Sequence, residues 1–488
     1  MKRQVELGVF TMIVMFGIFL FPKIENAASL NIPHFQNVSV HDPSVIKVDD
    51  TFYVFGSHLA AAKSTNLMQW QQISTSVSRA NPLFEDVFAE LEEAFTWANT
   101  NTLWAADVTQ VGDKYYMYYN ACEGSSPRSA MGLAVADHIE GPYVNQGIFL
   151  KSGMWGELSP DGTIYDPTIH PNAIDPHAFF DADGRFWLLY GSYSGGIFIL
   201  ELDPVEGIPF EGQGYGKHLI GGNHVRIEGP YMQYDASTGY YYLHLTYGGL
   251  DAAGGYNMRV MRSRNPDGPF VDAVGNRMDQ VRGPNGSFFD DRAIEPYGVK
   301  LMGNFFFERY PGEPGTGRGT GYISPGHNSV YTEENGESFI FFHTRFPGRG
   351  EAHEVRVHRL IMNRAGWPII APYRYAGESI ESVGWGDVVG TYKFINHGLA
   401  ISADVQHSSL IELHANGAVS GAATGYWWLS GDYYITLNLT DGFYEGVALR
   451  QWNETLQKHG LVFSAIGNNN MTIVGSKTTS LDTNGAAN

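Results

Sequence analysis

His41-Asp42-Pro43-Ser44-Val45 leads through a turn at Asp49-Asp50 into the aromatic stretch Phe52-Tyr53-Val54-Phe55. The same pattern, a short strand headed by an acidic residue or His, then a polar turn and an aromatic strand, occurs five times. Repeated hairpin units of this kind indicate the blades of a propeller. A helical repeat would need apolar residues at a spacing of 3.6, which these segments lack. We therefore predict an all-β chain that contains a five-bladed β-propeller.

The residues that head the repeats are mostly acidic. In a propeller the first strand of each blade lines the central channel, so residues far apart in the sequence meet near its axis. We expect the heads of the five repeats to converge there and to form the functional site. They are Asp42, Asp107, Asp175, Glu228 and His327.

The composition limits the partners. The 488 residues include 31 Lys and Arg and 51 Asp and Glu, so the net charge is 31 − 51 = −20. An acidic surface repels nucleic-acid phosphates and anionic lipids, and we expect neither nucleic acid nor membrane as a partner. Polygalacturonate would be repelled as well, which favours a neutral glycan. We expect the protein to act as a monomer.

Residues 1–28 have the features of a secretory signal peptide. Lys2 and Arg3 precede an apolar stretch from Leu7 to Pro22, and small residues follow where cleavage would occur. A membrane anchor is the alternative, but the apolar stretch is shorter than the ~20 residues that span a bilayer. We predict a secreted, extracellular protein. The single cysteine, Cys122, has no partner for a disulfide and is expected to be a buried apolar residue.

The repeat pattern ends near residue 378. We assign residues 29–378 to the propeller, 379–475 to a small all-β sandwich or barrel, and 476–488 to a disordered tail. The accessory domain has aromatic residues but no ring of acidic residues, so we expect it to support stability or substrate reach. Long insertions at 75–103 and 275–322 are predicted to form loops over one mouth of the channel.

Two carboxyl groups are the usual machinery for cleaving a glycosidic bond, one donating a proton and the other activating water or attacking. Asp42 and Glu228 are the natural pair, on blades one and four. Asp175 near Glu228 would raise the pKa of the acid by like-charge repulsion. Each carboxylate alone could be a structural turn residue, but three at equivalent repeat positions favour function. Asp107 either bonds to the channel backbone or reaches the sugar.

Four of these segments resemble the blade motifs of glycoside hydrolase family 43. They are His41-Asp42-Pro43-Ser44, Trp104-Ala105-Ala106-Asp107-Val108, Ile174-Asp175-Pro176 and Glu228-Gly229-Pro230-Tyr231. The resemblance covers roughly residues 34–375, and the domain after it looks like that of the two-domain extracellular endo-α-1,5-L-arabinanases. Many members have Trp-Ala-Pro-Asp where this chain has Trp-Ala-Ala-Asp, a difference that touches no catalytic residue.

The resemblance also implies roles. The family works with inversion, which makes Asp42 the general base, Glu228 the general acid and Asp175 the residue that tunes and orients the acid. The Asp42 and Glu228 carboxyls are then expected ~6.5–9.5 Å apart, which leaves room for water. Members of this kind carry a metal ion in the channel, typically calcium, held by the residue equivalent to His327 and a shell of water. Calcium prefers oxygen ligands, so this assignment rests on the resemblance alone.

The predicted substrate contacts are Asp107, Arg345 and three aromatic residues, Trp97, Trp104 and Phe179, whose rings could stack on sugars. Two other functions remain open. The same scaffold could carry a β-xylosidase or an α-L-arabinofuranosidase, because the sequence does not show whether the cleft is open or closed at one end. A non-catalytic sugar-binding propeller would have near-identical repeats, whereas these repeats diverge and only some carry acids.

Overall fold

The computed structural model describes residues 32–479. The predicted signal peptide, residues 1–28, lies outside that range, as do residues 480–488 of the predicted tail. Within the range, no helix is both long enough and apolar enough to cross a bilayer. Strands make up most of the regular structure, as predicted, and the helices are short.

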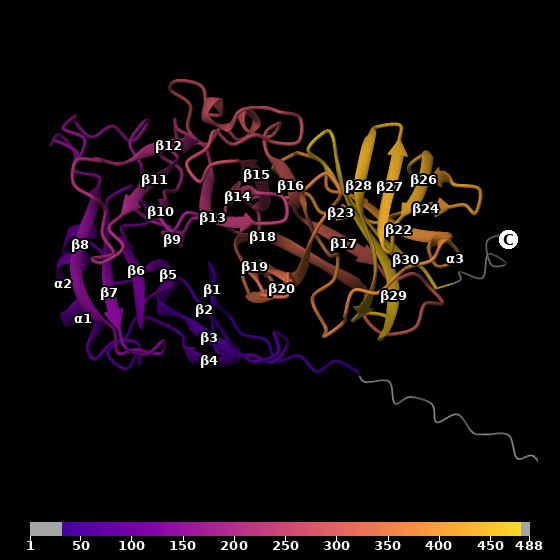
Figure 1. Ribbon diagram of the computed structural model, residues 1–488, viewed down its shortest axis with the longest axis horizontal. Helices are drawn as coiled ribbons and strands as arrows, with labels where there is room; N and C mark the ends of the chain where they lie inside the picture. Colours follow the sequence, from indigo (N-terminus) through magenta and orange to yellow (C-terminus); the bar gives the residue numbers. More distant parts are fainter. Residues whose placement is uncertain (1–31, 480–488) are drawn as a thin grey trace, which may run out of the picture. The chain divides into compact units, whose positions relative to one another are not determined.

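The propeller consists of five blades built on four antiparallel strands each, and two further strands extend the sheet of the fifth blade (Figure 1). Blades one and two contain β1 (Ser44–Val48), β2 (Thr51–Phe55), β3 (Ala61–Ser64), β4 (Gln71–Ser74), β5 (Trp104–Val111), β6 (Lys114–Cys122), β7 (Ser129–Ala136) and β8 (Val144–Ser152). Blades three and four contain β9 (His177–Phe180), β10 (Phe186–Tyr190), β11 (Ile197–Leu202), β12 (Lys217–Ile220), β13 (Ile227–Asp235), β14 (Tyr240–Tyr247), β15 (Asn257–Ser263) and β16 (Val299–Met302). Blade five contains β18 (Gly319–Thr332), β19 (Ser338–Arg345), β20 (His353–Met362) and β21 (Pro368–Ile370). The prediction of five blades is confirmed.

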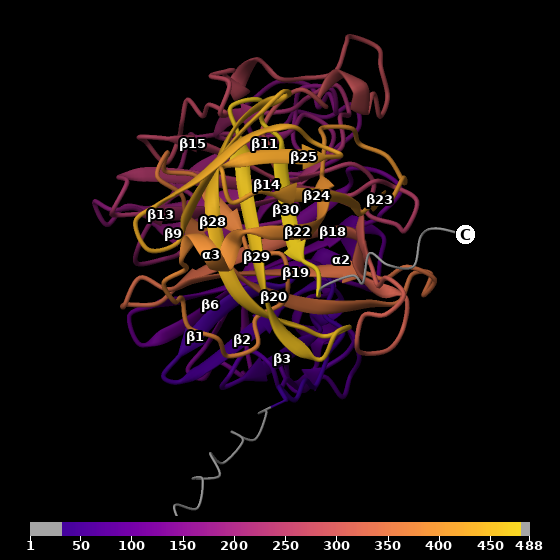
Figure 2. The same ribbon diagram turned by 90° about the vertical axis from the view of Figure 1, so that its right-hand side faces the viewer.

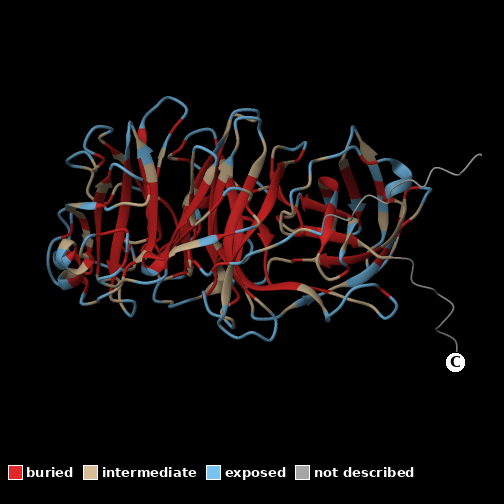
Figure 3. Ribbon diagram, turned by 90° about the horizontal axis from the view of Figure 1, so that it is seen from below, coloured by how far each residue is buried: buried red, intermediate tan, exposed pale blue. Residues whose placement is uncertain are grey.

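Each blade is buried on both faces, which explains the continuous aromatic runs in the second strands. On β6, Tyr115, Met117 and Tyr119 pack toward blade one, whereas Tyr116 and Tyr118 pack toward blade three. Successive side chains of a strand point to opposite faces, so a run without polar interruptions fits a strand between two neighbouring blades. Figure 3 shows the resulting buried strands with exposed loops at their ends.

The ring closes by packing rather than by exchange of a strand. All four strands of blade one come from residues 44–74, and those of blade five from residues 319–370. Phe339 and Phe341 of blade five pack with Phe52 and Val54 of blade one. This closing contact resembles the contacts between the other blades, so the ring is held mainly by the hydrophobic effect.

The prediction that residues 75–103 and 275–322 are loops over the channel mouth was wrong for much of both segments. The first contains α1 (Val87–Glu90) and α2 (Glu92–Ala98), which bury apolar side chains between blades one and two. The second supplies β16, the fourth strand of blade four, as well as β17 (Phe305–Glu308) and the start of β18. Short 3-10 helices occur at Ser57–Leu59, Met278–Gln280 and Asp291–Ala293.

After blade five the chain forms a closed eight-stranded barrel (Figure 1, Figure 2). A short helix, α3 (Trp385–Val388), precedes it. The barrel strands in spatial order are β22 (Gly390–Asn396), β24 (Ser409–Leu413), β25 (Ala418–Gly421), β26 (Gly425–Ser430), β27 (Tyr434–Leu439), β28 (Gly442–Asn453), β29 (Lys458–Gly467) and β30 (Thr472–Lys477). β30 ends at Lys477, two residues beyond the predicted end of this domain at 475, because Ser476 and Lys477 pair with β22.

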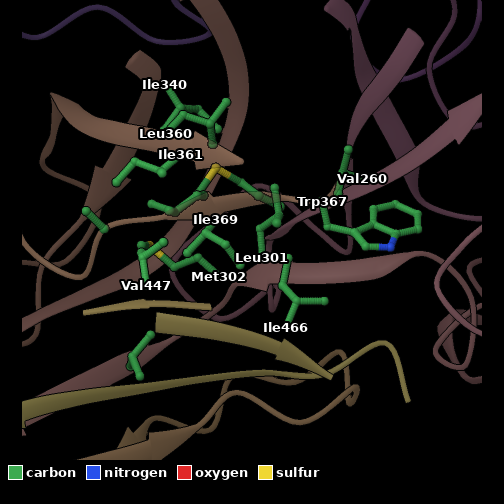
Figure 4. Close-up of a cluster of buried hydrophobic side chains, with 14 of the residues drawn as sticks. Val260, Leu301, Met302, Ile340, Leu360, Ile361, Trp367, Ile369, Val447 and Ile466 are labelled. Atoms are coloured by element: carbon green, nitrogen blue, oxygen red, sulfur yellow. The ribbon is translucent and has the colours of Figure 1, made fainter. Parts of the chain in front are cut away.

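The barrel and the propeller share a hydrophobic core. Val447 and Ile466 of the barrel lie in one buried cluster with Leu301, Met302 and Ile369 of blades four and five (Figure 4). β23 (Gln406–His407), from the barrel segment, pairs in parallel with β17 and so extends the fifth sheet. The accessory domain is therefore packed on the propeller, not merely tethered to it.

Candidate active site

The heads of four blades line one pocket of about 430 Å³. They are the three predicted catalytic residues, Asp42, Asp175 and Glu228, and the predicted metal ligand His327. The three carboxylates are almost fully buried. The propeller thus brings together residues spread over most of its length, as the repeat pattern predicted.

The backbone is irregular where these residues project. Asp42, Asp175 and His327 have φ values of 58°, 56° and 48°, in the left-handed region that L-residues rarely adopt. The pairing register also shifts after Glu228 on β13 and around His327 on β18. Bulges of this kind re-aim side chains and are common beside active sites. The conformation turns these side chains toward the pocket instead of into the packing between blades.

Asp42 is held by positively polarised neighbours. Its Oδ2 lies 2.8 Å from His41 Nδ1 and accepts a hydrogen bond from Ser57, and its Oδ1 lies 3.0 Å from His327 Nδ1. Burial alone would raise the pKa of Asp42, but attraction and hydrogen bonds from His327 and His41 outweigh it and hold the pKa well below its ordinary value. Asp42 therefore stays ionised and is suited to accept a proton.

The pKa values of Glu228 and Asp175 are shifted in the opposite direction, above their ordinary values. Glu228 accepts hydrogen bonds of 2.7 Å from Ser192 and from Tyr256, and Asp175 accepts one of 3.2 Å from the backbone N–H of Gly229. Burial raises the pKa of Asp175 to about 8, with His327 opposing the rise and the charge of Glu228 adding to it. Burial also raises the pKa of Glu228 against the effects of His327, Ser192 and Tyr256. Because the two carboxyls interact, they titrate as a pair that retains a proton near neutral pH.

Histidines surround the ionised carboxylate. Burial would lower the pKa of His327, but Asp42 and Asp175 raise it to about 9. Burial and His41 instead hold the pKa of His343 well below its ordinary value, and its Nδ1 accepts a 3.2 Å hydrogen bond from the N–H of Asp42. Within residues 32–479, His41, Asp42 and His343 offer ligand atoms within 4.8 Å of one another, so this group could hold a metal ion.

The family follows from comparison with known proteins. The model of glycosyl hydrolases family 43 matches residues 35–291, more than half of the chain. The chain belongs to glycosyl hydrolase family 43. A model described as a C-terminal lipocalin-like domain matches residues 372–475.

Several relatives cover nearly the whole family 43 chain. The extracellular endo-α-(1→5)-L-arabinanase 2 of Bacillus subtilis is 60% identical over 93% of this chain and 96% of its own length. The corresponding enzyme of Thermotoga petrophila is 47% identical over 91% of this chain and 94% of its own. The crystal structure of the family 43 protein YxiA from Bacillus licheniformis has a TM-score of 0.89 at 57% identity and covers 92% of this chain and all of its own.

The predicted substrate contacts of this family 43 chain do not all face the pocket. Trp104 lines it. Trp97 donates to the Ser129 carbonyl at 2.9 Å in the packing around blade two, and Phe179 stacks on His177 between blades. Arg345 is buried and contacts Glu351. The rings of Trp97 and Phe179 therefore serve packing, and the charge of Arg345 serves an ion pair with Glu351.

Asp107 is buried and is not among the residues that line the pocket. It lines a small cavity of about 10 Å³, room for about one water molecule. Its carboxylate accepts hydrogen bonds from Ser44 and from the backbone N–H of Ala178, the latter at 2.8 Å. These bonds link blades one, two and three. The bond from the Ala178 N–H fits the alternative in which Asp107 bonds to the channel backbone.

Several residues that line the pocket were not predicted from the sequence. Trp155, Phe288 and Phe289 are exposed aromatic residues at its edge, and Tyr193 packs edge-on against Phe289 at 5.4 Å. Ser192 and Tyr256, which bond to Glu228, were missed too. The only signal for the two Phe residues was their place in the insertion at 275–322, and this part of it does form a loop beside the pocket.

Proposed function

We propose that the protein is an inverting endo-α-1,5-L-arabinanase. The observation that carries this proposal is the contrast inside one pocket between Asp42, which is kept ionised, and the Asp175–Glu228 pair, which retains a proton. Such a contrast separates a base from an acid. The names of the two near full-length relatives support arabinan as the substrate and an extracellular site of action. We further propose that the enzyme is secreted and monomeric.

In this proposal the reaction is a single displacement. Glu228 donates a proton to the departing glycosidic oxygen, while Asp42 takes a proton from a water molecule that attacks the anomeric carbon from the opposite side. Ser192 and Tyr256 orient the acid by their hydrogen bonds. Asp175, whose pKa the charge of Glu228 helps to raise, shares the proton with Glu228 before the reaction. Attack from the face opposite the leaving group inverts the configuration.

The test of the function is the product pattern on debranched arabinan. The proposal predicts a mixture of short arabino-oligosaccharides early in the reaction, because an endo enzyme cuts internal bonds. Arabinose as the sole early product would instead show exo action. Xylose released from xylan substrates, with no attack on arabinan, would show that the scaffold serves a xylosidase.

We also propose that His327 holds the metal ion that the family resemblance implies, typically calcium. His327 lines the pocket, and the contact of its Nδ1 with Asp42 leaves Nε2 as the nitrogen that can face an ion. With a single protein nitrogen and acidic neighbours, the donor set fits a largely hydrated cation that replaces the proton on the ring. When bound, such an ion would add positive charge beside the carboxylates.

Removal of the metal is expected to lower activity. Prolonged chelation and the His327→Ala variant should both reduce arabinan hydrolysis and reduce the metal content of the purified protein, measured by elemental analysis. The control is His459→Ala, a change at an exposed position on strand β29 of the barrel, outside the pocket. Full activity in a verified metal-free preparation would refute the role, and unchanged metal content in His327→Ala would refute the ligand.

A further inference from the structure

One wall of the barrel exposes three large aromatic side chains. Tyr426 and Trp428 on β26 and Phe443 on β28 are 65%, 38% and 37% exposed. Alternation along β26 turns the intervening Trp427 into the barrel core, where it is buried. Water therefore reaches three rings that the fold does not need for its own packing, and exposed apolar clusters of this kind often mark binding sites.

The three rings form one surface with a polar centre. Strands β26, β27 and β28 are neighbours in the barrel (Figure 1). Tyr426 pairs with Asn438 on β27, and Asn438 pairs with Phe443 on β28, so these three side chains form a cross-strand row. Trp428 is two residues along β26 from Tyr426, and its ring centre lies 6.0 Å from that of Phe443. We call these four residues the aromatic wall. The exposed Asn438 amide lies among its rings.

A polar pocket of about 360 Å³ opens at the barrel mouth beside the wall. Two of its lining residues, Thr440 and Asp441, form the turn between β27 and β28 and directly follow the strand that carries Asn438. Its lining is rich in amide, hydroxyl and carboxylate groups. The polar lining residues are Asn396, Gln406, His407, Ser409, Thr440 and Asp441.

The barrel does not offer an apolar interior to a ligand, although the matching domain model is described as lipocalin-like. Tyr392, Trp427, Tyr444 and Phe463 are buried together in its centre. Small barrels bind ligands inside only where side chains leave space. The accessible binding features of this barrel are therefore the aromatic wall and the mouth pocket.

The aromatic wall also lies outside the joint with the propeller. The buried barrel residues of the shared core come from β22, β28, β29 and β30, with Val447 and Ile466 among them. Three rings give much less area than the roughly 800 Å² per partner that a stable protein interface buries. A narrow ligand on which apolar faces alternate with hydroxyl groups fits this surface better than a second protein does.

We propose that the aromatic wall and the mouth pocket bind a neutral glycan chain, namely a second segment of the arabinan that the propeller cleaves. The proposal rests on the proposed function for the identity of the glycan. Sugar rings present apolar C–H faces that stack on aromatic rings, and their hydroxyls bond to amides and carboxylates such as Asn438 and Asp441. A surface on the same compact unit as the cleft would hold a polymer near the active site and raise its effective concentration there.

The test uses the full-length chain in the Glu228→Gln background, so that polymer is bound without being cleaved. Affinity electrophoresis in debranched arabinan should show about 10-fold weaker binding when Trp428→Ala and Phe443→Ala are combined, the loss expected for two anchoring aromatic contacts. The matched control is Phe210→Ala, an aromatic residue on the propeller that is 44% exposed. The control should bind arabinan as the parent does. Polygalacturonate in the gel should not slow the migration of any variant.

The same double variant in the active enzyme separates this proposal from the proposed function. Its ratio of kcat/KM on arabinan to kcat/KM on arabinotriose should fall, because a trisaccharide is too short to reach both the cleft and the wall. Unchanged binding and an unchanged ratio, in an enzyme that cleaves arabinan, would overturn the second site and leave the function intact. A parent protein that sediments as a dimer and a variant that sediments as a monomer would overturn it in favour of self-association.

Discussion

Glu228→Gln is expected to lower kcat/KM on arabinan by about 10²–10⁴-fold, the usual contribution of general acid–base catalysis. The leaving group in a polysaccharide is a sugar alkoxide, which departs poorly without a proton, and an amide cannot donate one in this way. The amide keeps the size of the side chain and can still contact Ser192 and Tyr256. Steady-state kinetics on debranched arabinan measures the loss, with the exposed Glu211→Gln as the matched control.

The leaving group distinguishes the acid from the base. A substrate with an activated phenol leaving group needs little help from an acid, so Glu228→Gln should be much less impaired on it. Asp42→Asn should be impaired on both substrates, because water must be activated whichever group departs. Equal losses on the two substrates for Glu228→Gln, with binding intact, would show that another carboxyl, with Asp175 the first candidate, is the acid.

Removal of residues 379–488 is expected to prevent recovery of a soluble, stable propeller. The cut would expose Leu301, Met302 and Ile369, which the structure buries in the core shared with the barrel. Each such side chain returned to water costs roughly 1.5–3 kcal/mol, and the whole folded domain is stable by only about 5–15 kcal/mol. The cut would also remove Asn470, whose side chain donates to Asp272 at 2.8 Å.

Soluble yield and thermal unfolding of the truncated chain measure this effect. A milder change tests the same contact in the intact protein: Ile466→Ala should lower the free energy of unfolding by about 2–5 kcal/mol. Val205→Ala, at an exposed position on the propeller, should leave it nearly unchanged. A soluble truncated chain that unfolds cooperatively at the temperature of the full-length protein would show that the barrel is dispensable for stability.

The sequence predicted the architecture because a propeller repeats one packing problem. The second strand of each blade must bury both of its faces, so aromatic runs such as Tyr115 to Tyr119 mark the blades without any alignment. The same repeat assigns equivalent positions, and this is why Asp42, Asp175, Glu228 and His327 could be placed in one site. The second domain was predicted only as a small all-β sandwich or barrel, because alternation reveals strands but not how they close.

The substrate contacts were harder to predict because residue type does not fix direction. Trp97 and Phe179 are as aromatic as Trp104, yet only Trp104 lies where the strand start faces the pocket. Phe289 was missed because its place depends on the fold of the surrounding loop. Arg226 beneath it forms an ion pair with Asp291, with 3.1 Å from Nε to the carboxylate, and helps to hold that loop. No local pattern encodes such a contact across 65 positions.

The anomeric configuration of the first product tests the central claim most directly. Proton NMR spectra recorded during the first minutes of arabinan hydrolysis, before mutarotation, show which anomer forms at the new reducing end. With Asp42 as base and Glu228 as acid in a single displacement, the α-linkage should yield the β-anomer first. Initial release of the α-anomer would mean a double displacement through a covalent intermediate, and would contradict the roles assigned to both residues.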